Sequence, residues 1–157
     1  MKITRKITIE YETDVQISEI TLLSKEEYIL AKEIICPIKG WWWLRSPGSN
    51  QYYAAYVNYG GSLSSSSVYY DYCCVRPALR IRNLKSSNLK IKDKFQIAGY
   101  IWTVVIETTD EIVALCDDSI GVTAFHNDWK ADDANDFEKS DIKKYLYKWA
   151  EQKGITF

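Results

Sequence analysis

The sequence lacks a surplus of charge of either sign and lacks any long apolar run. Its 20 Lys and Arg residues are balanced by 21 Asp and Glu residues, for a formal net charge of -1. This balance gives no electrostatic reason to expect nucleic acid or an anionic membrane as a partner. No apolar run approaches the roughly 20 residues of a membrane span. The first residues alternate apolar and charged side chains, unlike a signal peptide. We therefore expect no membrane insertion and a cytoplasmic protein, unless a larger particle carries it out of the cell.

Residue types that usually carry catalysis or hold metal ions are also scarce. His126 is the only histidine, and the four cysteines (Cys36, Cys73, Cys74 and Cys116) form no CxxC pair and no zinc pattern. The sequence has no Gly-rich phosphate loop and no HExxH motif. We interpret the cysteines as reduced thiols in a reducing compartment. These features predict a protein that is not an enzyme and uses no cofactor; a catalytic His126 and a reactive Cys73–Cys74 pair are the alternatives.

An acidic run precedes the last predicted helix, and calcium binding is one interpretation of it. The run lacks the regular Asp spacing and the turn glycine of an EF-hand. Negative charge near a helix N-terminus is favourable without any metal. We therefore expect a solvated loop and no metal site. The acidic residues are Asp128, Asp132, Asp133, Asp136 and Glu138.

The chain is long enough for one domain with a real core, since 46% of its 157 residues are hydrophobic. We expect a single domain over residues 1–157 with two halves, residues 1–82 and residues 92–157. In the first half, alternation predicts a strand over residues 2–12. Ser24 and Glu27 have the spacing of a capping box, which predicts a helix from about Lys25 to Glu33.

Two further strands are predicted in the first half. The Trp-rich segment "WWWLRSPGS" reads as a strand that turns at Pro47 and Gly48. The segment "VRPALRI", residues 75–81, alternates and reads as a closing strand, in which Pro77 indicates an edge position or a bulge.

The second half is predicted to contain a hairpin and a helix. Two β-rich runs, Gln96 to Glu107 and Glu111 to Cys116, flank a short polar turn. The last helix should begin after Ser140 as N-cap and end before Gly154, because its apolar residues recur at helical spacing.

The residues from Ser49 to Cys74, here called the tyrosine-rich region, draw on very few residue types. Eighteen of these 26 residues are Tyr, Ser, Asn, Asp or Cys, and seven of the chain's 12 Tyr lie there. Tyr offers a large, stiff, amphipathic contact surface, and Ser, Asn and Gly adapt their hydrogen bonds, as in antibody binding loops. The alternative is that Tyr and Ser are ordinary strand and turn residues. The segments "SSSS" and "YYDYCC" lack the alternation which that interpretation needs.

The genetic code offers a second explanation of this composition. Asn is encoded by AAC or AAT, and changes at the two adenines alone give Tyr, Ser, Asp and Cys. Cys73 and Cys74 could then arise without selection for thiol chemistry. The same changes also reach Gly and Val, so the eight remaining positions are a fixed scaffold only if these residues are not themselves products of variation. They are Gln51, Ala54, Ala55, Val57, Gly60, Gly61, Leu63 and Val68.

"WWWLRSPGS" followed by "VRPALRI" resembles the framing motifs of a family of bacterial and phage C-type-lectin-like domains, related in fold to formylglycine-generating enzymes. The region between the motifs resembles the variable region of diversity-generating retroelement target proteins, in which an error-prone reverse transcriptase mutates template adenines. The resemblance implies an α+β, C-type-lectin-like fold with two helices and small antiparallel sheets. It also implies a non-enzymatic ligand-binding protein, or a paralogue of such a target; the enzymatic activity is not implied, since nothing around Cys73 and Cys74 matches the enzymes.

The second half resembles segments that usually precede the "WLRSPG" motif. The halves are therefore in the opposite order to the family, which indicates a circular permutation or halves that exchange in a swapped dimer or other homo-oligomer. The partner would be a protein or another surface ligand. The alternative function is a structural or receptor-binding subunit of a phage or surface assembly.

For individual residues, the resemblance implies a scaffold and a ligand-contacting set. The scaffold comprises Trp41, Trp42, Trp43, Leu44, Arg45, Arg76 and Pro77. We expect Arg45 and Arg76 to bond carbonyl or carboxylate groups within the protein, because a guanidinium provides five donors. The predicted ligand contacts are Tyr52, Tyr53, Tyr56, Asn58, Tyr59, Ser64, Ser65, Ser66, Tyr69, Tyr70, Asp71 and Tyr72.

Overall fold

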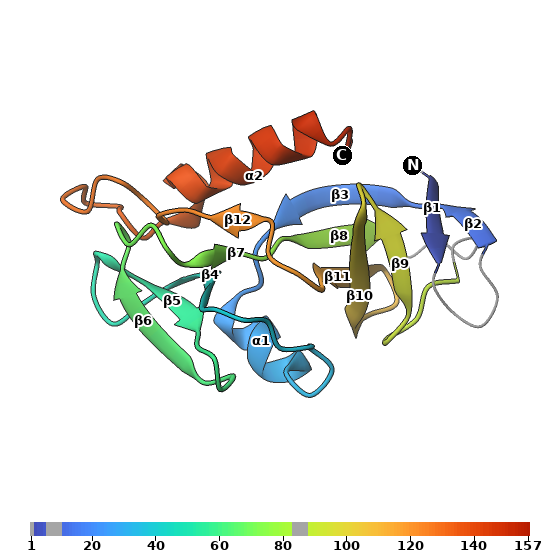
Figure 1. Ribbon diagram of the computed structural model, residues 1–157, viewed down its shortest axis with the longest axis horizontal. Helices are drawn as coiled ribbons and strands as arrows, with labels where there is room; N and C mark the ends of the chain where they lie inside the picture. Colours follow the sequence, from blue (N-terminus) through green and yellow to red (C-terminus); the bar gives the residue numbers. More distant parts are fainter. Residues whose placement is uncertain (1, 6–10, 83–87) are drawn as a thin grey trace.

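The computed structural model describes residues 2–5, 11–82 and 88–157, and it shows a mixed α+β protein with two α-helices and two β-sheets (Figure 1). The predicted class, α+β with two helices and mainly antiparallel strands, is confirmed. The elements are β1 (Lys2–Arg5), β2 (Tyr11–Asp14), β3 (Gln16–Thr21), α1 (Lys25–Ala31), β4 (Trp42–Pro47), β5 (Tyr53–Val57), β6 (Leu63–Ser67), β7 (Cys74–Val75), β8 (Ala78–Arg82), β9 (Lys94–Ile97), β10 (Tyr100–Glu107), β11 (Glu111–Cys116), β12 (Gly121–Val122), the short 3-10 helix η1 (Phe137–Lys139) and α2 (Asp141–Gln152).

The larger sheet has seven strands in the order β2-β1-β9-β10-β11-β8-β3, and every pairing in it is antiparallel. Strand β8 joins the two halves of the chain, because it pairs with β3 on one side and with β11 on the other. Leu79 of β8 lies opposite both Ile20 and Ala114. The halves therefore share one continuous hydrogen-bonded sheet.

The smaller sheet has five strands in the order β12-β7-β4-β5-β6. Strands β4 and β7 run parallel, and the other neighbours are antiparallel. Strands β5 and β6 and the first residue of β7 belong to the tyrosine-rich region, so the segment "SSSS" lies in a strand although it lacks alternation. In Figure 1 the smaller sheet lies between α2 and α1.

Strand β5 is covered on both faces. Ala54 and Tyr56 belong to the apolar cluster that includes the buried face of α2, whereas Ala55 and Val57 belong to the cluster that includes α1. Successive side chains of a strand point to opposite faces, so β5 fastens the tyrosine-rich region to both parts of the core.

Both helices begin where the sequence indicates. The Ser24 side chain accepts a hydrogen bond from the Glu27 N–H, and the Glu27 carboxylate accepts one from the Ser24 N–H. Helix α1 ends at Ala31, earlier than the predicted Glu33. Ser140 caps α2 by accepting from the Lys143 N–H. Among the described residues, no helix is long and apolar enough to span a membrane.

Three strand predictions differ from the structure. Residues 2–12 are not one strand, because the described ends belong to β1 and β2, which pair antiparallel; residues 6–10 lie outside the described residues. The run from Gln96 to Glu107 is divided between β9 and β10 at Ala98 and Gly99, both with positive φ. Pro77 lies between β7 and β8, where the chain passes from one sheet to the other, so it marks neither an edge nor a bulge. The hairpin of β10 and β11 is confirmed.

Candidate functional site: an aromatic surface

Burial divides the tyrosine-rich region into exposed and core positions. Tyr59, Tyr72, Tyr69 and Tyr52 are exposed, with fractions of 70%, 56%, 47% and 38%. Tyr53 and Tyr70 are half-buried. Four of the eight predicted scaffold positions are buried, namely Ala54, Ala55, Val57 and Val68. The other predicted contacts are exposed (Ser64 and Asp71) or half-buried (Asn58, Ser65 and Ser66).

Tyr56 lies in the core, apart from the other predicted contact residues. It is 9% exposed, and its ring stacks on Trp41 and meets Trp43 edge-on. Its place follows from β5, which directs Tyr56 to the same face as the buried Ala54. Cys73 and Cys74 are also buried.

Asn58 and Ser65 hold the local backbone. The Asn58 side-chain oxygen accepts from the N–H groups of Gly60 and Ser62, at 3.0 Å each, and so shapes the turn between β5 and β6. Ser65 Oγ accepts from the Ser49 N–H at 3.3 Å. The structure thus gives both residues a supporting part.

The exposed tyrosines are linked into a series of ring contacts that begins at Trp41. Trp41 lies 6.2 Å from both Tyr59 and Tyr72, measured between ring centroids. Tyr72 lies 5.2 Å from Tyr70, which lies 5.3 Å from Tyr69. Aromatic pairs at these separations attract each other in tilted and edge-on arrangements.

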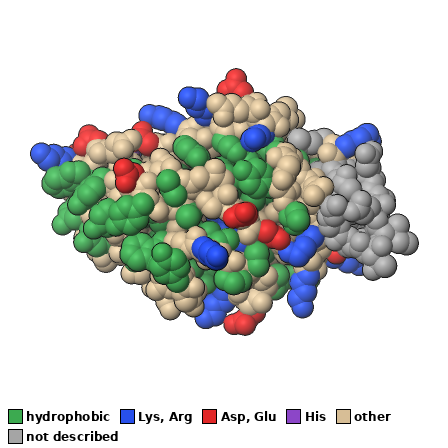
Figure 2. Space-filling view, in the orientation of Figure 1, with side chains coloured by type: hydrophobic (Ala, Val, Ile, Leu, Met, Phe, Trp, Pro, Cys, Tyr) green, Lys and Arg blue, Asp and Glu red, His purple; other side chains and the backbone are tan. Residues whose placement is uncertain are grey.

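Trp129 continues the series across to the other end of the region. Its ring lies 6.4 Å from Tyr69 and 5.9 Å from Tyr52, and Tyr52 meets Tyr53 at 5.4 Å. We call the whole series the aromatic surface. It comprises Trp41, Tyr52, Tyr53, Tyr59, Tyr69, Tyr70, Tyr72 and Trp129. Figure 2 shows hydrophobic side chains gathered at the left end of the molecule, over the five-stranded sheet.

Sequence reasoning missed Trp129, which is 42% exposed and comes from the acidic loop of the second half. Asn135 fixes this loop against the tyrosine-rich region, because its Nδ2 donates to the carbonyl oxygens of Asn50 and Tyr53, at 3.0 Å each. A Trp among polar loop residues was the only local signal of this role. The surface is therefore built from both halves of the chain.

The aromatic surface carries little charge of its own. Asp71 is exposed beside Tyr72, and Lys130 places its ammonium 5.4 Å from the centre of the Trp129 ring. Desolvation by the neighbouring side chains, followed by the influence of Tyr70, raises the pKa of the Tyr72 hydroxyl. The phenol hydroxyl can both donate and accept a hydrogen bond.

The arginines of the framing motifs bond within the protein, as predicted. Arg45 donates to the Leu22 carbonyl at 2.7 Å and to the Glu27 carboxylate at 2.5 Å. Arg76 is 1% exposed and donates through Nε to the Cys116 carbonyl at 2.7 Å. Both therefore pin the segments that support the aromatic surface.

The alternative catalytic groups have ordinary structural surroundings. The His126 Nδ1 accepts a hydrogen bond from the Asp128 N–H at 3.1 Å and lies 3.4 Å from the Asp141 carboxylate. That carboxylate accepts a hydrogen bond from the Asn127 N–H. Burial raises the pKa of the Cys73 thiol well above its ordinary value, which keeps it unreactive. Within residues 2–5, 11–82 and 88–157, no group of three or more His, Cys, Asp and Glu side chains could hold a metal ion.

Comparison with known proteins gives one family match. Residues 12–83 match the model of a family described as a domain of unknown function (DUF6273). No curated protein and no solved structure matches the chain. The matched span includes the whole tyrosine-rich region and α1, whereas Trp129 and α2 lie beyond it.

Proposed function

We propose that this protein is a non-enzymatic binding protein whose recognition site is the aromatic surface. The observation that carries the proposal is the unbroken series of ring contacts from Tyr59 through Trp41 and Trp129 to Tyr53. Rigid Tyr and Trp rings offer large contact areas at low entropic cost, and their polar groups bind a partner's hydrogen-bonding groups. Such residues dominate the centres of protein interfaces.

We further propose that the fold is a circularly permuted C-type-lectin-like fold and that the tyrosine-rich region is, or derives from, a diversified variable region. Burial supports the second part. Ala54, Ala55, Val57 and Val68, which the codon argument assigns to a fixed scaffold, are buried. Most positions that adenine changes could vary are exposed or half-buried, and the exceptions are Tyr56, Cys73 and Cys74. Variation at the exposed positions would alter recognition without disturbing the core.

Sequencing this gene and its close copies in related isolates tests the diversification. We expect substitutions to concentrate at adenine positions of a common Asn-rich template, while codons 54 and 55 and the framing motifs stay constant. Substitutions spread evenly over codons 49–74 would contradict it.

Binding itself is tested with a triple variant, Tyr59→Ala, Tyr72→Ala and Trp129→Ala, on a panel of glycans and purified cell-surface proteins. We expect a partner bound by the wild type to lose at least about tenfold in affinity, since interface aromatics commonly contribute more than this. The matched control is Tyr147→Ala on α2, which removes a 39% exposed tyrosine outside the aromatic surface. Equal loss in both variants, or no loss in the triple variant, would contradict the proposal.

A further inference from the structure

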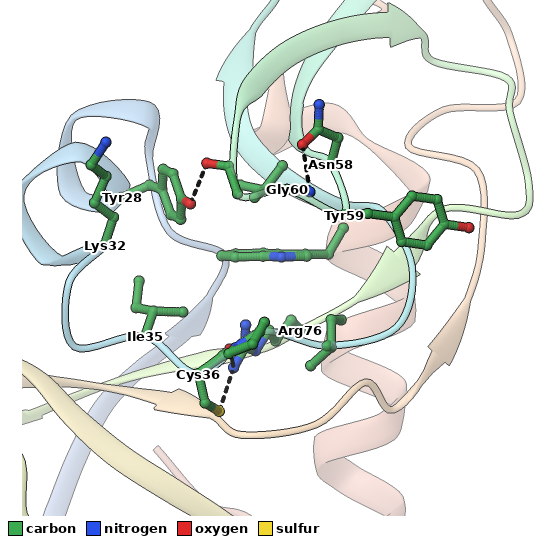
Figure 3. Close-up of a pocket in the computed structure, with 13 residues that line it drawn as sticks. Tyr28, Lys32, Ile35, Cys36, Asn58, Tyr59, Gly60 and Arg76 are labelled. Atoms are coloured by element: carbon green, nitrogen blue, oxygen red, sulfur yellow. Dashed lines mark hydrogen bonds between the residues drawn. The ribbon is translucent and has the colours of Figure 1, made fainter.

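A pocket of about 160 Å³ lies between the segment that follows α1 and the turn between β5 and β6. Figure 3 shows Asn58 and Gly60 on one side of it and Cys36 with Arg76 on the other. Arg76 forms part of this wall with its guanidinium 4.9 Å from the centre of the Trp42 ring. The pocket borders the aromatic surface at Tyr59, which lines the pocket and also contacts Trp41.

Arg76 is a buried cation with an incomplete set of partners. Its Nε and Nη2 donate to the carbonyl oxygens of Cys116, Cys36 and Asp117, and Nη2 also lies 3.1 Å from the Cys36 sulfur. Among the described residues, Nη1 has no hydrogen-bond partner, although it is fully buried. The Asp117 carboxylate is engaged elsewhere, since it accepts from Lys94 and Thr103.

The electrostatic position of Arg76 is therefore unfavourable. Burial lowers its pKa, and the nearby Cys36 sulfur is the first of the groups that act in the opposite direction. The hydrogen bonds of this buried guanidinium go only to neutral groups, so it lacks the directly bonded counter-charge that usually accompanies a buried cation. An anion placed at Cys36, whose sulfur lies 3.1 Å from Nη2, would supply that charge.

Cys36 differs from the other cysteines in its exposure. All four lie in the described part of the chain; Cys73, Cys74 and Cys116 are buried, and Cys36 is partly exposed at the pocket. Burial raises the pKa of Cys116 to about 12, which leaves it unreactive. A partly exposed thiol beside a cation is the setting in which cysteine oxidation is selective.

We propose that Cys36 is an oxidation site, at which a hydroperoxide converts the thiol to an anionic sulfur–oxygen group that pairs with Arg76. In the first step the sulfur bonds to one peroxide oxygen and the O–O bond breaks. The sulfur becomes a sulfenic acid, losing two electrons, and the other peroxide oxygen leaves with a proton as an alcohol or water. A second hydroperoxide gives the sulfinic acid in the same way, and this acid is anionic at neutral pH.

The first test treats the folded protein with hydrogen peroxide and follows each cysteine by peptide mass spectrometry. We expect Cys36 to gain one and then two oxygens at least about tenfold faster than the three buried cysteines. We also expect the thermal midpoint of the oxidised protein to equal or exceed that of the reduced protein. Oxidation spread over several cysteines, or a lower midpoint after selective oxidation of Cys36, would overturn the proposal.

The second test asks whether a negative charge at position 36 pairs with Arg76, independently of how exposed Cys36 is to oxidants. It needs no oxidant. Cys36→Asp places a carboxylate beside Arg76, and Cys36→Asn is a neutral control of the same shape. We expect the thermal midpoint of Cys36→Asp to exceed that of Cys36→Asn by at least about 2 °C, the shift that follows from one charge-assisted hydrogen bond in a chain of this length. Equal midpoints, or a higher midpoint for Cys36→Asn, would overturn the pairing. Neither test depends on the aromatic surface.

Discussion

The indole ring of Trp41 stacks on the phenol ring of Tyr56, with their centroids 5.0 Å apart and their planes 23° apart. Trp41 is half-buried, whereas Tyr56 is almost fully buried. The pair therefore connects the aromatic surface to the core. A stacked pair of this kind contributes about 0.5–1.5 kcal/mol beyond the area that it buries, which helps to hold Trp41 in contact with Tyr59 and Tyr72.

Replacing Tyr56 and replacing Tyr72, both in the tyrosine-rich region, should have sharply different effects on stability. Tyr56→Ala should lower the free energy of unfolding by about 3–5 kcal/mol, because it leaves a cavity in the core. Tyr72→Ala should lower it by less than about 1 kcal/mol, because that side chain is exposed. Urea unfolding of both variants measures the difference. Similar losses in the two variants would mean that the buried position of Tyr56 is wrong.

Asn135 should control the order of the loop that carries Trp129. Asn135→Ala removes two hydrogen bonds to the backbone of residues 50 and 53 and should cost about 1–3 kcal/mol. Amide hydrogen exchange in residues 127–135 should speed up, while exchange in α2 should change less. Gln51→Ala, an exposed change in the facing turn, serves as the control. Unchanged exchange in the loop of the Asn135→Ala variant would show that other contacts hold it.

Glu27 should make stability fall in acid. Burial by itself raises its pKa, but the hydrogen bond from the Ser24 N–H and the charges of Arg45 and Arg80 outweigh burial and lower the pKa below its ordinary value. A carboxyl group whose pKa is lower in the folded state stabilises the protein above its unfolded pKa, about 4.3 for Glu. That contribution is lost as the pH falls through the folded value.

Glu27→Gln should therefore cost about 1.5–3 kcal/mol at pH 7, where charged hydrogen bonds are lost, and progressively less below about pH 4. Urea unfolding of both proteins across this pH range measures the difference. Glu26→Gln on the exposed side of the same helix turn is the control, which should cost much less. A constant difference between wild type and Glu27→Gln at all pH values would contradict the pKa argument.

Gly48, the glycine of the "WLRSPG" motif, should not tolerate a side chain. A Cβ at this position would lie 2.5 Å from the Ser65 Cβ and 2.8 Å from the Tyr53 Cβ. Gly48→Ala should therefore cost about 1–3 kcal/mol through overpacking. Gly60→Ala is the matched control, because a Cβ there meets only the Asn58 side-chain oxygen, at 3.6 Å. Chemical denaturation of the two variants tests the difference, and equal stability would contradict the close approach.

Structural features that depend on residues close together in the sequence, such as helix starts, could be predicted from the sequence. The side chains of Ser24 and Ser140 each accept from a backbone N–H three residues away, and both helices begin there. The turn that divides β9 from β10 shows the limit of local patterns. It uses Ala98 with φ of 55° followed by Gly99 with φ of 78°, and alanine rarely adopts such a conformation, so only the glycine signalled it.

The composition of the tyrosine-rich region indicated the candidate site, but composition does not say which of its residues are exposed. Alternation places Tyr56 and Ala55 on opposite faces of β5. It does not indicate whether both faces of a strand are buried, as they are in β5. The contacts of Trp129 with Tyr52 and Tyr69 join segments far apart along the chain. These contacts depend on how the loop before η1 packs against the five-stranded sheet, and no spacing in the sequence predicts that packing.

The place of β8 between β3 and β11 limits how this chain can be divided. A fragment that stopped after β8 would expose one full row of unpaired backbone groups on that strand, and the complementary fragment would expose the matching row on β11. Exposed rows of this kind are templates for aggregation. Each half would therefore be prone to aggregate once its strands had formed. Each half would also carry the strand, β8 or β11, with which the other half pairs.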